Sequence, residues 1–71
     1  MEKFYMVYAE EYIGPVYISS TLEGAEDHFK KKNYHNIDGE EGCATIRVVN
    51  NEMDLLESRY YEHFNLVNVK H

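Results

Sequence analysis

Two short segments near the start of the chain show the two-residue alternation of side chains that is typical of β-strands. The alternation predicts one strand over residues 3–9 and another over residues 16–19. Between them lies a reversal in which Gly14 permits a positive φ, while Pro15 sets its own φ and lacks a ladder donor. We therefore expect these two strands to pair as an antiparallel hairpin.

A helix is predicted next, over residues 21–33. Ser20 and Glu23 have the spacing of a capping box at its start. Three apolar residues follow on one helical face: Leu22, Ala25 and Phe29. Acidic residues in the first half and the lysines at 30–32 in the last turn match the two ends of the helix dipole.

The second half of the chain is predicted as a loop, a strand, a helix and a strand. A polar loop bounded by glycines covers residues 35–42, and strand-like alternation resumes over 43–49. Four apolar residues then recur at i, i+3, i+7 and i+11: Met53, Leu56, Tyr60 and Phe64. This spacing predicts a second amphipathic helix over 52–63, capped by the asparagine pair before it, and a last strand follows over 66–70.

The predicted elements follow the order β-β-α-β-α-β within a single α+β domain over residues 1–71. Each helix carries one apolar stripe, so both should lie on one face of the sheet. We therefore expect a two-layer sandwich with an antiparallel or mixed four-stranded sheet.

The face of the sheet away from the helices is expected to be aromatic. The residues expected to meet the helices are Phe4, Met6, Tyr8, Val16 and Ile18. The residues then expected to point outward are Tyr5, Val7 and Tyr17, joined by Tyr12. An uncovered aromatic face indicates a contact surface for a partner or for a second copy, although tyrosine also suits solvent-facing strand positions. Stacking of nucleic-acid bases is disfavoured, because Lys3 is the only basic residue near these strands and four carboxylates share the segment.

Charge narrows the class of partner. Thirteen acidic residues against seven basic ones give a formal net charge of −6. Such a field repels phosphate backbones and anionic membranes and attracts basic protein surfaces. The acids that the predicted elements leave unexplained lie in two loops: Glu10, Glu11, Asp38, Glu40 and Glu41. They indicate either a solvated, solubilising face or a surface complementary to a basic groove.

Catalytic and cofactor chemistry finds no support in the sequence. The histidines lack zinc-ligand spacing, and no nucleophile elbow or phosphate loop occurs, so we expect no enzyme, no metal and no cofactor. The single cysteine, Cys43, forms no internal disulfide and points to a reducing compartment such as the cytoplasm. Neither a signal peptide nor a membrane-spanning segment is expected.

In size and composition the chain resembles the compact, acidic, Tyr- and Asn-rich accessory proteins that bacteriophages make to block host proteins or defence systems. This resemblance transfers no site residues. It agrees with the hypothesis drawn from the residues, which is a non-enzymatic inhibitor or interaction protein that occupies a basic, nucleic-acid-binding surface of a larger protein. The residues expected to bind the partner are Tyr5, Tyr12 and Tyr17 as anchors and Glu10, Glu11, Asp38, Glu40 and Glu41 as charges.

Two other functions remain open on the sequence. One is an oligomeric small-molecule or nucleotide sponge whose inter-subunit pocket is lined by tyrosine, histidine and Arg47. The other is a self-assembling structural module in which the open sheet face serves only a homo-oligomer.

Overall fold

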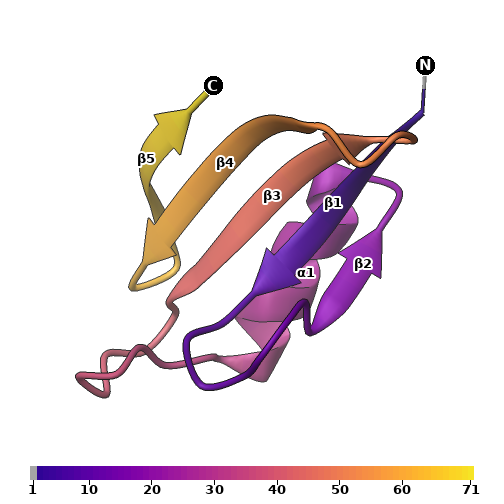
Figure 1. Ribbon diagram of the computed structural model, residues 1–71. Coiled ribbons are helices and arrows are strands. Elements are labelled where there is room, and N and C mark those ends of the chain that lie inside the picture. Colours follow the sequence, from indigo (N-terminus) through magenta and orange to yellow (C-terminus); the bar gives the residue numbers. More distant parts are fainter. Residues whose placement is uncertain (1) are drawn as a thin grey trace.

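The computed structural model describes residues 2–71 as a five-stranded sheet with one helix on one of its faces (Figure 1). The elements are β1 (Lys3–Tyr8), β2 (Tyr17–Ser19), α1 (Leu22–Lys32), β3 (Ala44–Asn50), β4 (Leu55–Glu62) and β5 (Asn65–Lys70). The strand order is β2-β1-β3-β4-β5, and every neighbouring pair is antiparallel. The predicted hairpin is confirmed, and α1 crosses one face to bring the chain back beside β1.

The expected fold class, with two helices on a four-stranded sheet, is wrong. The segment predicted as a second helix over 52–63 contains β4, which pairs with β3 on one side and β5 on the other. Its apolar spacing also suits a strand, because Leu56 and Tyr60 are four residues apart and so share one face of a strand as well as of a helix. As a strand, the segment supplies the backbone partners that the outer edge of β3 would otherwise lack.

Two tight turns replace the expected helix ends. The side chain of Asn50 accepts hydrogen bonds from the amides of Glu52 and Asp54, each 2.9 Å long, so this asparagine builds a turn rather than a helix cap. At the next reversal His63 and Phe64 both have positive φ, 51° and 67°. Two successive left-handed residues match the twist of a hairpin, but this conformation is usually indicated by Asn-Gly or Asp-Gly.

The N-cap of α1 lies one residue later than predicted. Thr21, not Ser20, is the N-cap: its backbone is extended, and its hydroxyl accepts a 3.0 Å hydrogen bond from the amide of Gly24. Asn33 ends the helix in the left-handed conformation at φ 51°. Within residues 2–71 no helix has the length and apolar character needed to cross a bilayer.

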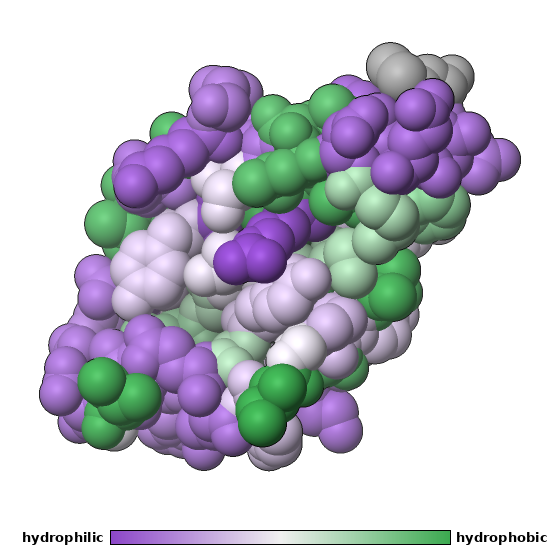
Figure 2. Space-filling view, in the orientation of Figure 1, coloured by the Kyte–Doolittle hydropathy of each residue, from purple (hydrophilic) through white to green (hydrophobic). Residues whose placement is uncertain are grey.

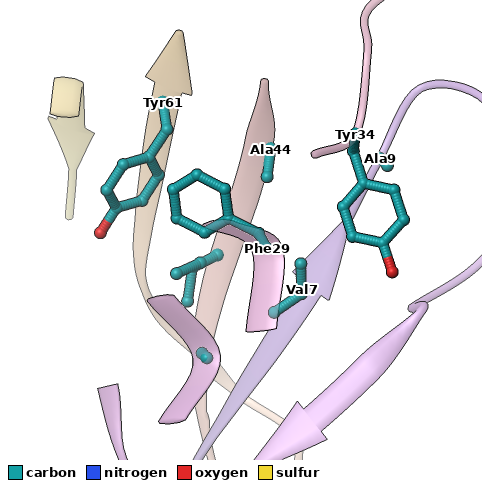
Figure 3. Packing of buried hydrophobic residues seen from close by; sticks show 8 residues of the cluster. Val7, Ala9, Phe29, Tyr34, Ala44 and Tyr61 are labelled. Atoms are coloured by element: carbon teal, nitrogen blue, oxygen red, sulfur yellow. The ribbon is translucent and has the colours of Figure 1, made fainter. Parts of the chain in front are cut away.

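The core lies between α1 and the middle of the sheet (Figure 3). Its buried residues are Val7, Ala9, Ala25, Phe29, Tyr34, Ala44, Ile46 and Tyr61. Phe29 is fully buried and its ring centre lies 4.7 Å from that of Tyr61 on β4. Burying these rings and branched side chains stabilises the fold by about 1.5–3 kcal/mol for each large side chain.

The helix covers the opposite face of β1 from the one expected. Val7 is fully buried beneath it, whereas Met6 and Tyr8 belong to the face that α1 leaves open. Because β1 is apolar on both sides, its alternation does not select the covered face. Which face of β1 is buried depends on the neighbouring strand β3, where the buried Ile46 pairs directly with Val7.

Candidate functional site

Two loops lie side by side at one end of the molecule, shown at the bottom of Figure 1. One joins β1 to β2 over residues 9–16, and the other joins α1 to β3 over residues 33–43. The carboxylate of Glu10 accepts a 3.0 Å hydrogen bond from the amide of Ile37, and that of Glu11 accepts a 2.9 Å bond from the amide of His35. We call this end, built from residues 9–16 and 33–43, the acidic end.

Asn36 holds the second loop in shape from within. It is buried, and its side-chain oxygen accepts hydrogen bonds from the amides of Asp38 and Glu40 at 3.0 and 2.9 Å. Its side-chain nitrogen donates a 2.9 Å bond to the Glu40 carboxylate. This bond is the main cause that lowers the pKa of Glu40 below 4.5, and His63 lowers it further. The charged carboxylate is therefore part of the loop's structure.

The β4–β5 turn supports the acidic end from the side. The amides of His63 and Phe64 donate hydrogen bonds of 3.1 and 3.0 Å to the carbonyls of Glu41 and Gly42. Gly42 has φ 66°, and a Cβ at this position would lie 2.5 Å from the Phe64 nitrogen. Only glycine therefore permits the loop to approach this turn so closely.

Exposed apolar side chains project from this braced end. Ile13 and Ile37 have relative exposures of 104% and 84%, and Tyr12 is 56% exposed. In Figure 2 this end shows separate hydrophobic spots within a hydrophilic surface. Exposed single apolar residues are common, but these three sit on two loops that carboxylates hold together. The arrangement places apolar tips within a charged surround, which resembles the anatomy of protein interfaces.

The five sequence-predicted acids lie together at the acidic end, but the three predicted tyrosines do not share one surface. Only Tyr12 joins the acids, where its ring meets that of Tyr34 edge to face at 5.8 Å. Tyr17 stacks on His28 of α1, with 4.0 Å between ring centres. Tyr5 packs against the core on the helix-covered face. The expected outward face of Tyr5, Val7 and Tyr17 therefore does not exist.

Sequence reasoning missed Ile13 and Ile37 as functional candidates. Both were included in polar reversals, and neither belongs to a periodic pattern. Their signal is local: each isoleucine stands one or two residues before a glycine that has positive φ, Gly14 or Gly39. A large apolar side chain at a turn lacks a neighbouring element to cover it, so it remains in solvent.

A groove of about 640 Å³ runs beside the acidic end, between α1 and the first loop. His28 and Tyr34 line it, with the His28 Nε2 atom 2.8 Å from the Tyr34 hydroxyl. Burial is the main cause that lowers the pKa of His28 below 6.5, and Lys32 lowers it further. Burial likewise raises the pKa of Tyr34. Both side chains are therefore held neutral at neutral pH.

Comparisons with protein-family models, with curated proteins and with solved structures find no match to this chain. Within residues 2–71, no three histidine, cysteine, aspartate or glutamate side chains group as metal ligands would.

Proposed function

We propose that this chain is a non-enzymatic binding protein that docks its acidic end on a basic surface of a larger protein. The observation that carries the proposal is the exposure of Ile13 and Ile37 on two loops that Glu10 and Glu11 hold together. Apolar tips supply the contacts that exclude water, and the surrounding carboxylates select a cationic partner.

The bracing of the loops favours tight binding. The loop contacts described above already order the backbone before a partner arrives, so little conformational entropy is lost on docking. Four of the five acidic side chains accept hydrogen bonds from other groups of the protein: Glu10, Glu11, Glu40 and Glu41. Asp38 is exposed at the same end and supplies charge without bracing the loop through its carboxylate.

In this proposal the chain is an inhibitor of the kind that bacteriophages make. It acts in the host cytoplasm on a protein with a nucleic-acid-binding surface. Support comes from size, composition and a net charge of −6. The free thiol of the buried Cys43 agrees with a reducing compartment.

Affinity capture from a host lysate, followed by binding kinetics with the protein identified, tests this function. The double variant Ile13→Ser/Ile37→Ser should weaken affinity by at least about tenfold, because the dry contacts are lost. The variant Asp38→Lys should slow association severalfold and flatten its salt dependence. Both substitutions alter exposed side chains, so the fold should be unchanged.

Matched controls lie elsewhere on the molecule. Glu52→Lys makes the same charge change at the β3–β4 turn, at the opposite end of the sheet (Figure 1). Ile18→Ser alters an isoleucine that is 55% exposed on β2. Equal effects of the control and test variants would show that the acidic end is not the binding site.

A second candidate function is the binding of a small anionic ligand in the groove beside α1. Lys32 and His35 line this groove together with the rings of Tyr12 and Tyr34. Arg47, which the sequence analysis expected in an inter-subunit pocket, lies on the open sheet face and does not line this groove. A thermal-shift screen with nucleotides, repeated on Lys32→Gln, tests this candidate. An unchanged melting temperature with every nucleotide would exclude it for the ligands tried.

A further inference from the structure

The open face of the sheet holds a pocket between two tyrosines. Tyr8 on β1, Thr45 on β3 and Tyr60 on β4 form one cross-strand row. They line a pocket of about 140 Å³ whose other walls include Cys43 and Glu10. In Figure 1 the helix lies behind the sheet, so Figure 2 looks onto this face.

The spacing of the two strands that carry the rings leaves room for a flat group. Tyr8 and Tyr60 stand on strands that flank β3, so their backbones are about 10 Å apart, twice the usual separation of neighbouring strands. A planar group in contact with one ring needs about 3.5–4 Å beside that ring. Thr45, the residue between them, is short enough to leave that space open.

The charges around this slot favour a cation. Glu10 lines it, and Glu62 accepts a 3.3 Å hydrogen bond from the Tyr60 hydroxyl. Burial and then the charge of Glu62 raise the pKa of Tyr60, and burial likewise raises the pKa of Cys43, with Glu62 and Glu40 adding to it. These shifts agree with a negative potential at the pocket.

The protein already displays one interaction of this type. The guanidinium carbon of Arg47 lies 4.5 Å from the ring centre of Tyr8. The Tyr8 ring therefore accepts a guanidinium in the native fold, as aromatic faces do. Arg47 does not line the pocket, and because its guanidinium already covers the Tyr8 ring, the Tyr60 ring is the aromatic wall available to a ligand.

We infer that the slot between Tyr8 and Tyr60 binds an arginine side chain of the partner, with the guanidinium against the Tyr60 ring and Glu10 and Glu62 balancing its charge. This inference rests on the proposed function, since it names one residue type that the basic partner would insert. Glu10 belongs both to this pocket and to the acidic end, so a docked partner reaches both at once.

The test uses the isolated protein and two probes that match in shape. N-acetyl-arginine methylamide carries the charged guanidinium, and N-acetyl-citrulline methylamide carries a neutral planar urea. Titration followed by amide NMR should give saturable shifts at Ala44, Thr45 and Tyr60 with the arginine probe. The citrulline probe should bind at least about fivefold more weakly, because its urea group carries no positive charge to interact with the ring and the carboxylates.

Variants locate the site. Tyr60→Leu keeps an apolar wall but removes the aromatic face, and should weaken arginine binding about tenfold. Glu10→Gln removes charge but keeps an oxygen to accept the Ile37 amide, so the loop stays braced while binding weakens severalfold. Tyr12→Leu, at the acidic end, is the matched control and should leave arginine binding unchanged. If Tyr60→Leu fails to fold, the comparison of arginine with citrulline still tests the inference, because it needs no variant.

Two outcomes overturn the inference. One is equal binding of citrulline and arginine. The other is a set of shifts confined to residues 11–13 and 37–41 that Tyr60→Leu leaves unaltered, which would leave the proposed docking of the acidic end standing. Conversely, failure of the Ile13→Ser/Ile37→Ser test would remove the acidic end as the docking site but would not change the probe titration, because that titration involves no partner protein.

Discussion

The hydroxyl of Tyr61 donates a 2.6 Å hydrogen bond to the carboxylate of Glu26, and this bond joins β4 to α1. Arg59 donates to the same hydroxyl at 3.1 Å and to Glu57 at 3.0 Å. Burial raises the pKa of Tyr61 to about 12, and the bond to Glu26 contributes to the rise. The helix is thus held to the sheet by a series of side-chain hydrogen bonds beside the Phe29–Tyr61 ring contact.

Removing this hydroxyl should destabilise the protein without disturbing the ring packing. We expect Tyr61→Phe to lower the free energy of unfolding by about 1–3 kcal/mol, because Glu26 and Arg59 lose a shared partner. Urea denaturation measures the loss. Tyr60→Phe is the neighbouring control: its hydroxyl bond to Glu62 is longer, at 3.3 Å, and connects no separate element, so its effect should be smaller. Equal losses would contradict the assigned role of Tyr61.

Truncation of the central ring should bring the fold close to unfolding. Phe29 is fully buried, and Phe29→Ala should cost about 3–5 kcal/mol. A 71-residue chain has a total stability of about 4–11 kcal/mol at the usual value per residue. Ile13→Ser, at a fully exposed site, should change stability by less than about 0.5 kcal/mol. Thermal melts of the two variants check the contrast, and a large loss from Ile13→Ser would show that Ile13 supports the fold.

A comparison of two glycines distinguishes the cost of a strained backbone from the cost of a steric clash. Gly39 and Gly42 have φ of 82° and 66°, but a Cβ on Gly39 meets nothing within 4 Å, whereas one on Gly42 meets Phe64. Gly39→Ala should cost about 1–2 kcal/mol from the left-handed backbone alone. Gly42→Ala should cost clearly more, because the loop must also move away from the β4–β5 turn. Chemical denaturation compares them, and equal costs would show that the turn gives way freely.

Acidification should destabilise the fold partly through His28. Its folded-state pKa lies below 6.5, so the unfolded state binds more protons as the pH falls through about 6.5. The contribution of neutral His28 to the stability of the fold is present above pH 6.5 and is lost as the pH falls toward the folded-state pKa. Melting temperatures between pH 7.5 and 5.5 should fall less steeply in His28→Gln than in the unaltered chain. An NMR titration midpoint for His28 at or above 6.5 would contradict this.

Local signals were sufficient for the first half of the chain. The alternation in β1 and β2, the turn at Gly14 and Pro15, and the helix pattern around Phe29 all depend on near neighbours in sequence. The helix boundary moved by one residue because Ser20 and Thr21 both have capping side chains, and only the geometry decided that Thr21 caps. The grouping of the loop acids was also predictable in part, since both loops were expected to be polar reversals.

In the second half of the chain the strands predicted over 43–49 and 66–70 are confirmed as β3 and β5, but the helix predicted over 52–63 is wrong, for a physical reason. Met53, Leu56, Tyr60 and Phe64 have helical spacing, but the turns that flank β4 use Asn50 and the His63-Phe64 pair, which carry no standard hairpin signal. The pairing with β3 then outweighed the local pattern, because an unpaired sheet edge would have remained. The pocket on the open sheet face could not be predicted for the same reason, since Tyr8 and Tyr60 come to line it only because both strands pair with β3.

By itself, the amino-acid sequence determined an acidic, mixed α and β chain with one helix around Phe29 and with its surplus carboxylates in two loops. Only the tertiary structure decided which face of β1 the helix covers, that residues 55–62 form a strand, and that Ile13 and Ile37 are presented at one end. The physical reason is that local periodicity records which side chains can share a face. The face that is buried depends on contacts between segments far apart in the chain, such as Val7 with Ile46 and Glu26 with Tyr61.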